Sequence, residues 1–185
     1  MRNFFIGVFV AFLGIFGIVY VFFAGGFAPV ATAAPPLPFE KLMASLALKA
    51  RVSKEAPKEA PFQPTAATYA DGATTYLTHC ALCHGLPGHP RTPIAAGEFP
   101  RPPALLEGRG VADDPVGVTY WKIANGIRMT GMPSFDHSLS ARQTWSVAWM
   151  LKDADELPPE VKGRLQQGTA QAPAVGGSGS TGQGR

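Results

Sequence analysis

The pattern of apolar and polar positions begins with a long uncharged run. The twenty residues from Phe4 to Phe23 carry no charge and are almost all apolar. As a helix they would span about 30 Å, which matches the hydrocarbon core of a bilayer. Since Arg2 is the only nearby charge on the short side of the run, the positive-inside rule places the N-terminus in the cytoplasm and the rest outside.

Two interpretations of this first segment remain open. In the first, residues 1–28 form an uncleaved signal-anchor, which is a transmembrane helix. In the second, a signal peptide is cleaved near Ala31-Thr32-Ala33, which has the small-residue pattern of such sites. The apolar run is longer than the roughly 7–15 residues of a typical signal peptide, which favours the anchor. Under both interpretations the remaining chain is exported.

Residues 29–65 form a proline-rich linker that contains one amphipathic helix. Prolines cluster at both ends of the linker, whereas residues 39–55 contain neither Pro nor Gly. Apolar residues recur at helical spacing in this stretch, and they are Phe39, Leu42, Met43, Leu46 and Ala50. The pattern leaves open whether this apolar face packs on the chain's own domain, on a membrane or on a partner chain.

Residues 66–162 have the helical periodicity of an all-α domain. The pattern predicts a helix from about Ala67 to His79, another that begins at Pro115 with Asp114 as its N-cap, and a last one after Ser140. A long loop rich in Pro and Gly separates the first two. No stretch shows the period-two alternation of a strand. The Gly-rich composition after this domain predicts a flexible tail over residues 163–185.

The sequence Cys80-Ala81-Leu82-Cys83-His84 is the most specific motif in the chain. Two thiols on one helical turn can reach both vinyl groups of one haem, and the adjacent imidazole then faces the iron. This spacing indicates covalent attachment of one haem c. A thioredoxin-like site would need a βαβ context, and a zinc site would need a second pair of ligands. Neither is visible in the sequence.

The predicted second ligand of the iron is Met132, with His84 as the first. Met132 lies between Gly131 and Pro133, which allow a close approach of the backbone and a fixed turn. Met129 is the competing methionine, and we expect it to pack in the core instead. Three further side chains are alternatives that we expect to lie at the surface or in loops, and they are His79, His89 and His137.

From about Thr68 to Leu157 the chain resembles a single-haem class I cytochrome c domain. The resemblance rests on the Cys-x-x-Cys-His motif, on Pro103-Ala104-Leu105 and on Gly131-Met132-Pro133. It implies an all-α fold around one covalent haem, preceded here by the transmembrane helix and the linker helix.

The resemblance also implies roles for particular residues. The carbonyl of Pro103, with Pro102 as the alternative, would accept the proton of His84 and orient its ring. Trp121 would donate to a haem propionate or pack as a core aromatic. The contact between the first and last helices would involve three residues, namely Gly72, Tyr76 and Trp149.

The function implied is outer-sphere electron transfer between redox partners, and not enzymatic catalysis by this chain alone. One alternative is a haem c subunit of a larger membrane oxidoreductase complex, and another is an open-site haem enzyme or sensor. The expected partners are the membrane and membrane-bound or soluble redox proteins. The resemblance places the haem domain in the periplasm of a bacterium, on an anchor in the cytoplasmic membrane or, after cleavage, in solution.

The charge distribution favours an anionic partner for the linker and the tail only, and we expect no nucleic-acid partner. The chain has a formal net charge of +3 and a pI near 9. Residues 66–162, however, carry eight Lys or Arg against ten Asp or Glu. The positive charge therefore belongs to the linker and the tail, and the haem domain itself is slightly acidic.

Overall fold

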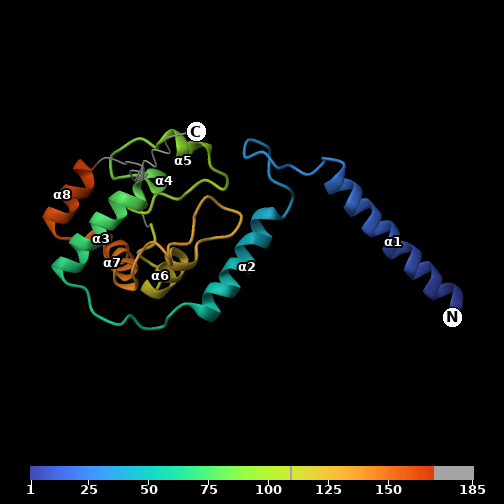
Figure 1. Ribbon diagram of the computed structural model, residues 1–185, viewed down its shortest axis with the longest axis horizontal. Helices are drawn as coiled ribbons and strands as arrows, with labels where there is room; N and C mark the ends of the chain where they lie inside the picture. The colour runs from blue at the N-terminus through green and yellow to red at the C-terminus, as the bar shows by residue number, and fades with distance from the viewer. Residues whose placement is uncertain (109, 169–185) are drawn as a thin grey trace, which may run out of the picture. The chain divides into compact units, whose positions relative to one another are not determined.

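The computed structural model describes residues 1–108 and 110–168, and all regular secondary structure within these ranges is helical. The all-α prediction is therefore confirmed. The chain divides into two compact units, one of Met1–Ser45 and one that begins at Leu46. Figure 1 labels the helices of both units.

The first unit contains helix α1 (Arg2–Ala24), which has no buried residue. By length and composition, α1 is a helix that could cross a membrane, located close to the N-terminus. Helix α2 (Glu40–Glu55) begins in this unit and ends in the second. Its bounds agree with the predicted linker helix over residues 39–55.

The second unit is built on helix α3 (Ala66–His79), which crosses helix α7 (Ala141–Lys152). A Cβ atom on Gly72 would lie 2.8 Å from the Cβ of Met150 and closer still to the carbonyl oxygen of Ser146. The absence of a side chain at Gly72 therefore allows the two helices to approach closely. The resemblance implied Trp149 as a partner here, whereas the nearest atoms belong to Ser146 and Met150 on the facing side of α7.

Helix α6 (Val116–Asn125) packs on α7 through a stacked aromatic pair. The rings of Tyr120 and Trp145 are 4.1 Å apart and inclined by 18°. The predicted N-cap of this helix is wrong by one residue. Pro115 is the N-cap, and the carboxylate of Asp114 instead accepts from Lys122 at 3.0 Å.

Helix α7 begins as the sequence predicts. The side chain of Ser140 accepts a hydrogen bond from the amide of Gln143, and the Gln143 side chain accepts from the amide of Ser140. This reciprocal pair is a capping box, which satisfies two amides that the first turn leaves free. The helix ends at Lys152 with Asp153 as its C-cap.

The predicted tail begins too early. Residues Pro159–Gln167 form helix α8, which packs on α3, and its Val161 and Leu165 are each 2% exposed. These two apolar side chains lie four residues apart on one helical face, and their burial stabilises the helix although its other residues are mostly polar. Residues 169–185 of the predicted tail lie outside the described residues.

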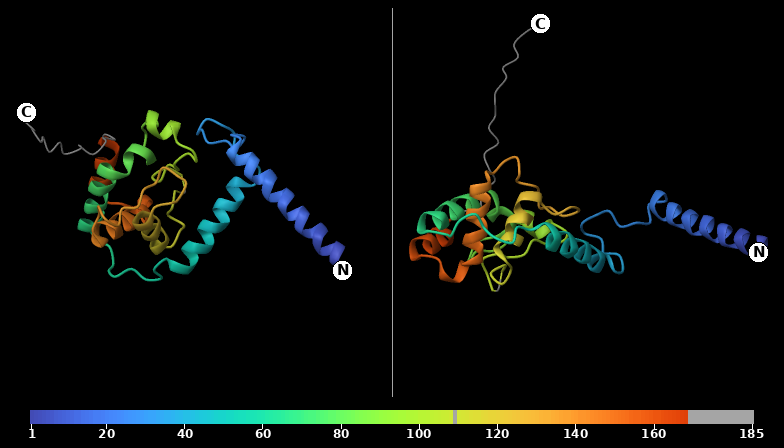
Figure 2. Two further views of the ribbon diagram at one scale, coloured as in Figure 1. Left: turned by 45° about the vertical axis from the view of Figure 1, so that its right-hand side comes forward. Right: turned by 90° about the horizontal axis from the view of Figure 1, so that it is seen from below.

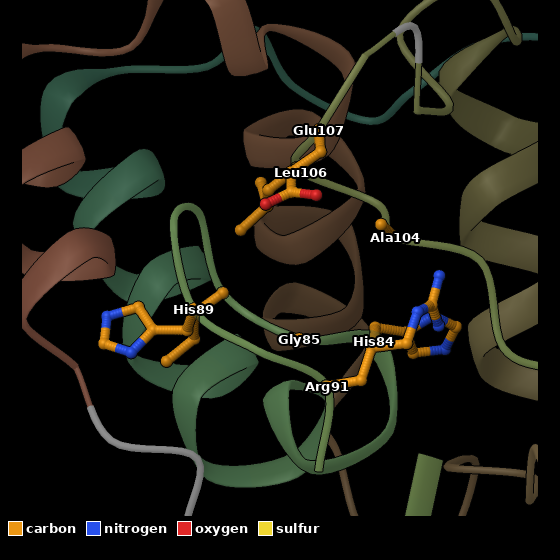
Figure 3. A pocket seen from close by; sticks show the side chains of 8 residues that line it. His84, Gly85, His89, Arg91, Ala104, Leu106 and Glu107 are labelled. Atoms are coloured by element: carbon orange, nitrogen blue, oxygen red, sulfur yellow. The ribbon is translucent and has the colours of Figure 1, made fainter. Parts of the chain in front are cut away.

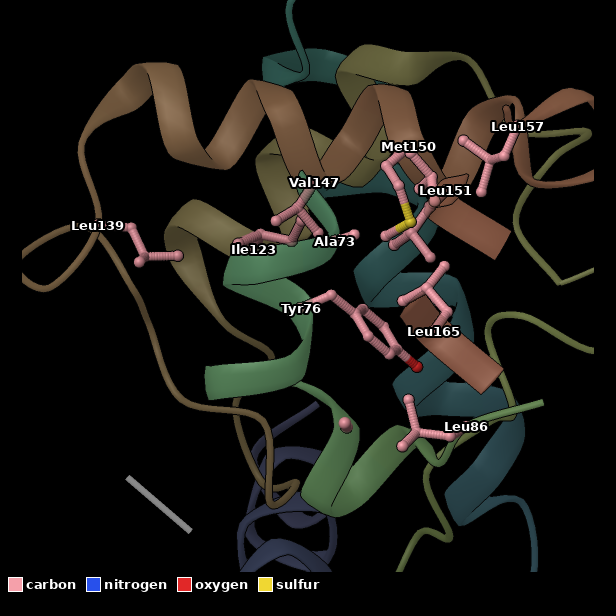
Figure 4. Packing of buried hydrophobic residues seen from close by; sticks show 12 residues of the cluster. Ala73, Tyr76, Leu86, Ile123, Leu139, Val147, Met150, Leu151, Leu157 and Leu165 are labelled. Atoms are coloured by element: carbon pink, nitrogen blue, oxygen red, sulfur yellow. The ribbon is translucent and has the colours of Figure 1, made fainter. Parts of the chain in front are cut away.

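The core of the second unit lies where α3, α7 and α8 meet (Figure 4). Tyr76 is fully buried, and its hydroxyl donates to the carbonyl of Gly85 at 2.9 Å. This bond joins α3 to the turn that follows helix α4 (Ala81–His84). The other buried members of the cluster are Ala73, Ala81, Leu86, Ile123, Leu139, Val147, Met150, Leu151, Leu157, Val161 and Leu165.

The end of the predicted linker packs on the helices of the second unit. The indole nitrogen of Trp149 donates to the carbonyl of Phe62 at 3.2 Å, and the Arg142 guanidinium lies over the Phe62 ring, 5.4 Å from its centre. The backbone of Pro57 lies so close to Gly117 on α6 that a side chain there would collide with it. Figure 2 shows this segment running between α2 and α3.

Candidate functional site

The Cys-x-x-Cys-His motif occupies the break between α3 and α4. Cys80 ends α3, and its amide donates to the carbonyl of Tyr76 at 2.8 Å. The carbonyl of Cys80 then accepts from the amide of His84 at 2.9 Å. Both thiols and the imidazole are thus held on one short helical turn, anchored to α3.

The two thiols are neutral at pH 7. Burial is the main cause that raises the pKa of Cys80 to about 12. Burial and a hydrogen bond to Glu98 raise the pKa of Cys83 to about 11, and the Sγ–Oε1 distance is 3.1 Å. Both cysteines of the chain lie in the described part and remain unpaired thiols.

The imidazole of His84 is held in one orientation by the backbone. Its Nδ1 lies 2.9 Å from the carbonyl oxygen of Pro103. Because a carbonyl only accepts hydrogen bonds, Nδ1 must carry the proton, and Nε2 keeps its lone pair. Burial lowers the pKa of His84, although the bond to Pro103 opposes this shift. The ring is therefore neutral with a fixed tautomer, and its Nε2 is free to bind a metal.

Arg91 holds the segment that orients His84. Its guanidinium donates to the carbonyl of Pro102 at 2.8 Å, next to the carbonyl that accepts from His84. His84, His89 and Arg91 line a small pocket, and Figure 3 shows Arg91 and His84 on one side of it and His89 on the other. The sequence suggested Pro102 and Pro103 as alternatives for one role, and the structure gives each carbonyl its own donor.

The loop after the motif contains a short helix that the sequence did not predict. Helix α5 (Pro93–Gly97) begins after Thr92, whose side chain accepts from the amide of Ala95. The Thr92 hydroxyl also donates to the carbonyl of Leu82 at 2.6 Å. This bond fixes α5 against α4, and it brings Glu98 to the thiol of Cys83.

Glu98 lies close both to the turn that holds the two thiols and to the loop that contains Met132. Besides its contact with Cys83, its carboxylate lies close to Gly131, where a Cβ atom would be 2.6 Å from Oε2. Neither Arg91 nor Glu98 was singled out from the sequence. Both are single charged residues in an irregular loop, where no periodicity indicates a partner.

The second predicted ligand, Met132, belongs to a loop fixed by backbone hydrogen bonds. Its amide donates to the Thr130 hydroxyl at 3.1 Å, and its carbonyl accepts from Ile127 at 3.2 Å. The Met132 side chain is partly buried against the core. Gly126 has φ +66° and lies against Pro133, so a side chain at this position would be strained and obstructed.

The competing side chains are placed differently from Met132. Met129 is 91% exposed with φ +61°, so the expectation that it packs in the core is wrong. His89 is bonded to the carbonyl of Gln166 on α8 at 2.7 Å. The ring of His79 packs edge-on against Phe135, and His137 is exposed.

Trp121 lies on α6 and is partly buried. Its carbonyl accepts from the side-chain amide of Asn125 at 2.9 Å. Its assignment to a haem propionate stays a prediction.

The donor set fits a covalently bound haem. Two neutral thiols lie on one turn beside an imidazole with a free Nε2, and a thioether lies on a separate rigid loop. A zinc site gains no support, because no group of three or more His, Cys, Asp or Glu in the described part could hold a metal ion. Both thiols and the imidazole on one turn suit a haem held by two thioether bonds.

Comparison with protein families agrees with this chemistry. Residues 67–149 match the family model described as cytochrome C oxidase, cbb3-type, subunit III. The match begins in α3 and ends in α7, so it contains the thiols, the imidazole and the Met132 loop. No curated protein sequence matches the chain significantly.

Proposed function

We propose that this chain, whose residues 67–149 are a cytochrome c domain with covalently bound haem c, is a membrane-anchored carrier of single electrons. When bound, the haem supplies an iron that alternates between Fe(II) and Fe(III). Cys80 and Cys83 would form the two thioether bonds to the haem, and His84 and Met132 would bind its iron. The proposal rests mainly on one observation, namely that a single helical turn holds both thiols beside His84.

The residues around the site would keep the iron environment nearly constant in both oxidation states. The Pro103 carbonyl restrains His84 from one side. The hydrogen bonds of Thr130 and Ile127 restrain Met132 from the other. Since a rigid ligand set changes little on oxidation, it favours rapid electron transfer. With both His84 and Met132 bound, the iron would have no open position for a substrate, which separates this function from that of a haem enzyme or sensor.

The assignment of Met132 is tested by a matched pair of methionine variants. We expect Met132→Ala to lose the weak ferric absorption band that arises from Met–iron bonding. We also expect its reduction potential to fall by on the order of 0.1 V, because a thioether ligand raises the potential. The measurements are absorption spectroscopy and a redox titration of the membrane-bound protein.

Met129→Ala is the control for this experiment. Met129 is 91% exposed on the same loop, so its removal should leave both the band and the potential unchanged. A wild-type protein without the band, or a Met132→Ala variant that keeps it, would contradict the proposed ligation.

A second candidate function is that of a haem c subunit in a larger oxidase complex. The matching family is described as a subunit of an oxidase, and this description favours the candidate. Solubilisation in mild detergent followed by native electrophoresis distinguishes the two functions. A haem-stained band of high mass with other chains supports the subunit, and a band at the mass of this chain alone supports the carrier.

We further propose that α1 is retained as a transmembrane anchor, with the haem domain on the periplasmic side. The length and composition of α1 support a membrane span. An anchor confines the domain near membrane-bound redox partners and so raises its effective concentration there.

A further inference from the structure

Helix α2 exposes a continuous apolar face in its first half. Leu42 is 52% exposed, Met43 64% and Leu46 53%. At about 3.6 residues per turn these side chains lie on one side of the helix, and Ala50 extends the same side by one turn. Phe39, immediately before the helix, is 74% exposed. An exposed apolar face of this kind indicates a surface that is covered by lipid or by another molecule.

This apolar face differs from the side of α2 that is buried. Val52, the buried residue of the helix, is 5% exposed. It follows Leu46 by six residues and therefore points about 120° away from it. The packing that covers Val52 does not extend to the apolar face.

Two lysines border the apolar face. At about 100° per residue, Lys49 lies at one edge of the face and Lys54 at the other. Long lysine side chains in such positions lay their methylene groups along an apolar surface and keep the ammonium group at its polar boundary. The opposite side of the helix carries Arg51 and Glu55, which form an exposed ion pair at 2.7 Å. An apolar face with one lysine at each edge matches a membrane interface with anionic headgroups.

The chain between α1 and α2 limits how far α2 lies from the membrane that α1 would cross. Fifteen residues separate Ala24 from Glu40, and fully extended they reach at most about 50 Å. A tether of this length keeps α2 at a high effective concentration at the lipid surface.

From these observations we propose that α2 lies in the lipid–water interface of the membrane, with its apolar face toward the acyl chains and Lys49 and Lys54 at the anionic headgroups. The inference rests on the proposed function of α1 as an anchor. The chain would then contact the membrane a second time, immediately before the haem domain, and the strength of this contact would depend on the anionic lipid content.

The test places a fluorophore on one side of α2 or the other. Haem attachment consumes both native thiols, so a new cysteine is the only free thiol in the holoprotein. Ala50→Cys lies on the apolar face, and Ala44→Cys lies on the opposite side of the same helix. Both replace an exposed alanine and remove no apolar anchor. Each full-length variant is labelled with an environment-sensitive fluorophore and reconstituted into vesicles of phosphatidylethanolamine and phosphatidylglycerol.

We expect lipids with brominated acyl chains to quench the label at position 50 about twofold or more strongly than the label at position 44. Replacement of both Lys49 and Lys54 by Gln, or of phosphatidylglycerol by phosphatidylcholine, should reduce this difference. Equal quenching at both positions, or none at either in protein that stays in the vesicles after an alkaline wash, would overturn the inference.

Other occupants of the face give different results. A label at position 50 that emits as if buried but is not quenched by brominated lipid indicates coverage by protein, and this overturns the inference. If that emission depends on protein density in the vesicle, the cover is a second copy of the chain. Loss of the protein from the vesicles during the alkaline wash would instead contradict the anchor, which separates the failure of the proposed function from the failure of this inference.

Discussion

At the scale of single residues, the site depends on backbone carbonyls whose positions are fixed by side chains. The Pro103 carbonyl fixes the tautomer of His84, and Arg91 binds the neighbouring carbonyl of Pro102. Prolines supply no amide donor of their own, so this segment depends on side chains for its hydrogen bonds. Arg91 is therefore a positioning residue that acts on His84 through the backbone.

Replacing Arg91 tests this indirect role. We expect Arg91→Leu to lower the free energy of unfolding of the holoprotein by about 1 kcal/mol, since it removes a charge-assisted hydrogen bond that is partly exposed. We also expect a shift of the reduction potential, because His84 loses part of the restraint that fixes its ring. Guanidinium unfolding and a redox titration measure these effects.

Arg101→Leu is the matched control. Arg101 is exposed and lies in the same loop, so its replacement should leave both quantities close to the wild-type values. A potential that is unchanged in Arg91→Leu would show that Arg91 has a structural role alone.

At the scale of helices, the crossing of α3 and α7 determines where the attachment turn lies. Gly72 allows the close crossing. One turn later in α3, the hydroxyl of Tyr76 donates to the carbonyl of Gly85. Because Cys80 caps the end of α3, any shift of α3 relative to α7 moves the thiols relative to the rest of the site.

A side chain at position 72 should therefore be costly. We expect Gly72→Ala to destabilise the protein by about 1–3 kcal/mol, because the new methyl group meets the backbone of Ser146 and the Cβ of Met150. Thermal or guanidinium unfolding of the holoprotein measures the loss.

Gly163→Ala separates packing from helix propensity. Gly163 is a helical glycine on α8, and a Cβ atom there would meet nothing within 4 Å. Alanine should be neutral or stabilising by up to about 1 kcal/mol at this position. Similar effects of the two substitutions would contradict a close contact at Gly72.

At the scale of the whole molecule, charge and apolar surface are unevenly distributed along the chain. This distribution suits α1 to lipid and residues 66–162 to water. Helix α1 is almost entirely apolar and has no buried residue, whereas residues 66–162 have a slight excess of acidic groups. A surface such as that of α1 is stable in lipid and unfavourable in water.

Retention of α1 is testable on the intact protein. We expect the chain to stay with the membrane after alkaline extraction and to have a mass that includes residues 1–33, because its apolar run matches a full bilayer span. Cell fractionation and mass spectrometry are the measurements. Enlarging both small residues of the candidate cleavage site, with Ala31→Leu and Ala33→Leu, should change nothing. A wild-type chain that begins after Ala33, together with retention of this double variant, would contradict the anchor.

Much of the fold was predictable because its signals are local. A capping box at Ser140 and Gln143 depends on residues three positions apart, and the apolar run of α1 depends on composition alone. Helix α8 was missed because its apolar positions, Val161 and Leu165, are only two. These two side chains are buried only because α8 packs on α3, which lies about 80 residues earlier in the chain.

The sequence by itself determined the chemistry of the attachment site, because two thiols and an imidazole within five residues are brought together by a single helical turn. Only the tertiary structure decided what surrounds them. It gave separate donors to the carbonyls of Pro102 and Pro103, exposed Met129 while burying part of Met132, and placed Glu98 beside Cys83. These contacts join residues from different loops, and such loops are positioned by the packing of α3, α6 and α7 rather than by their own sequences.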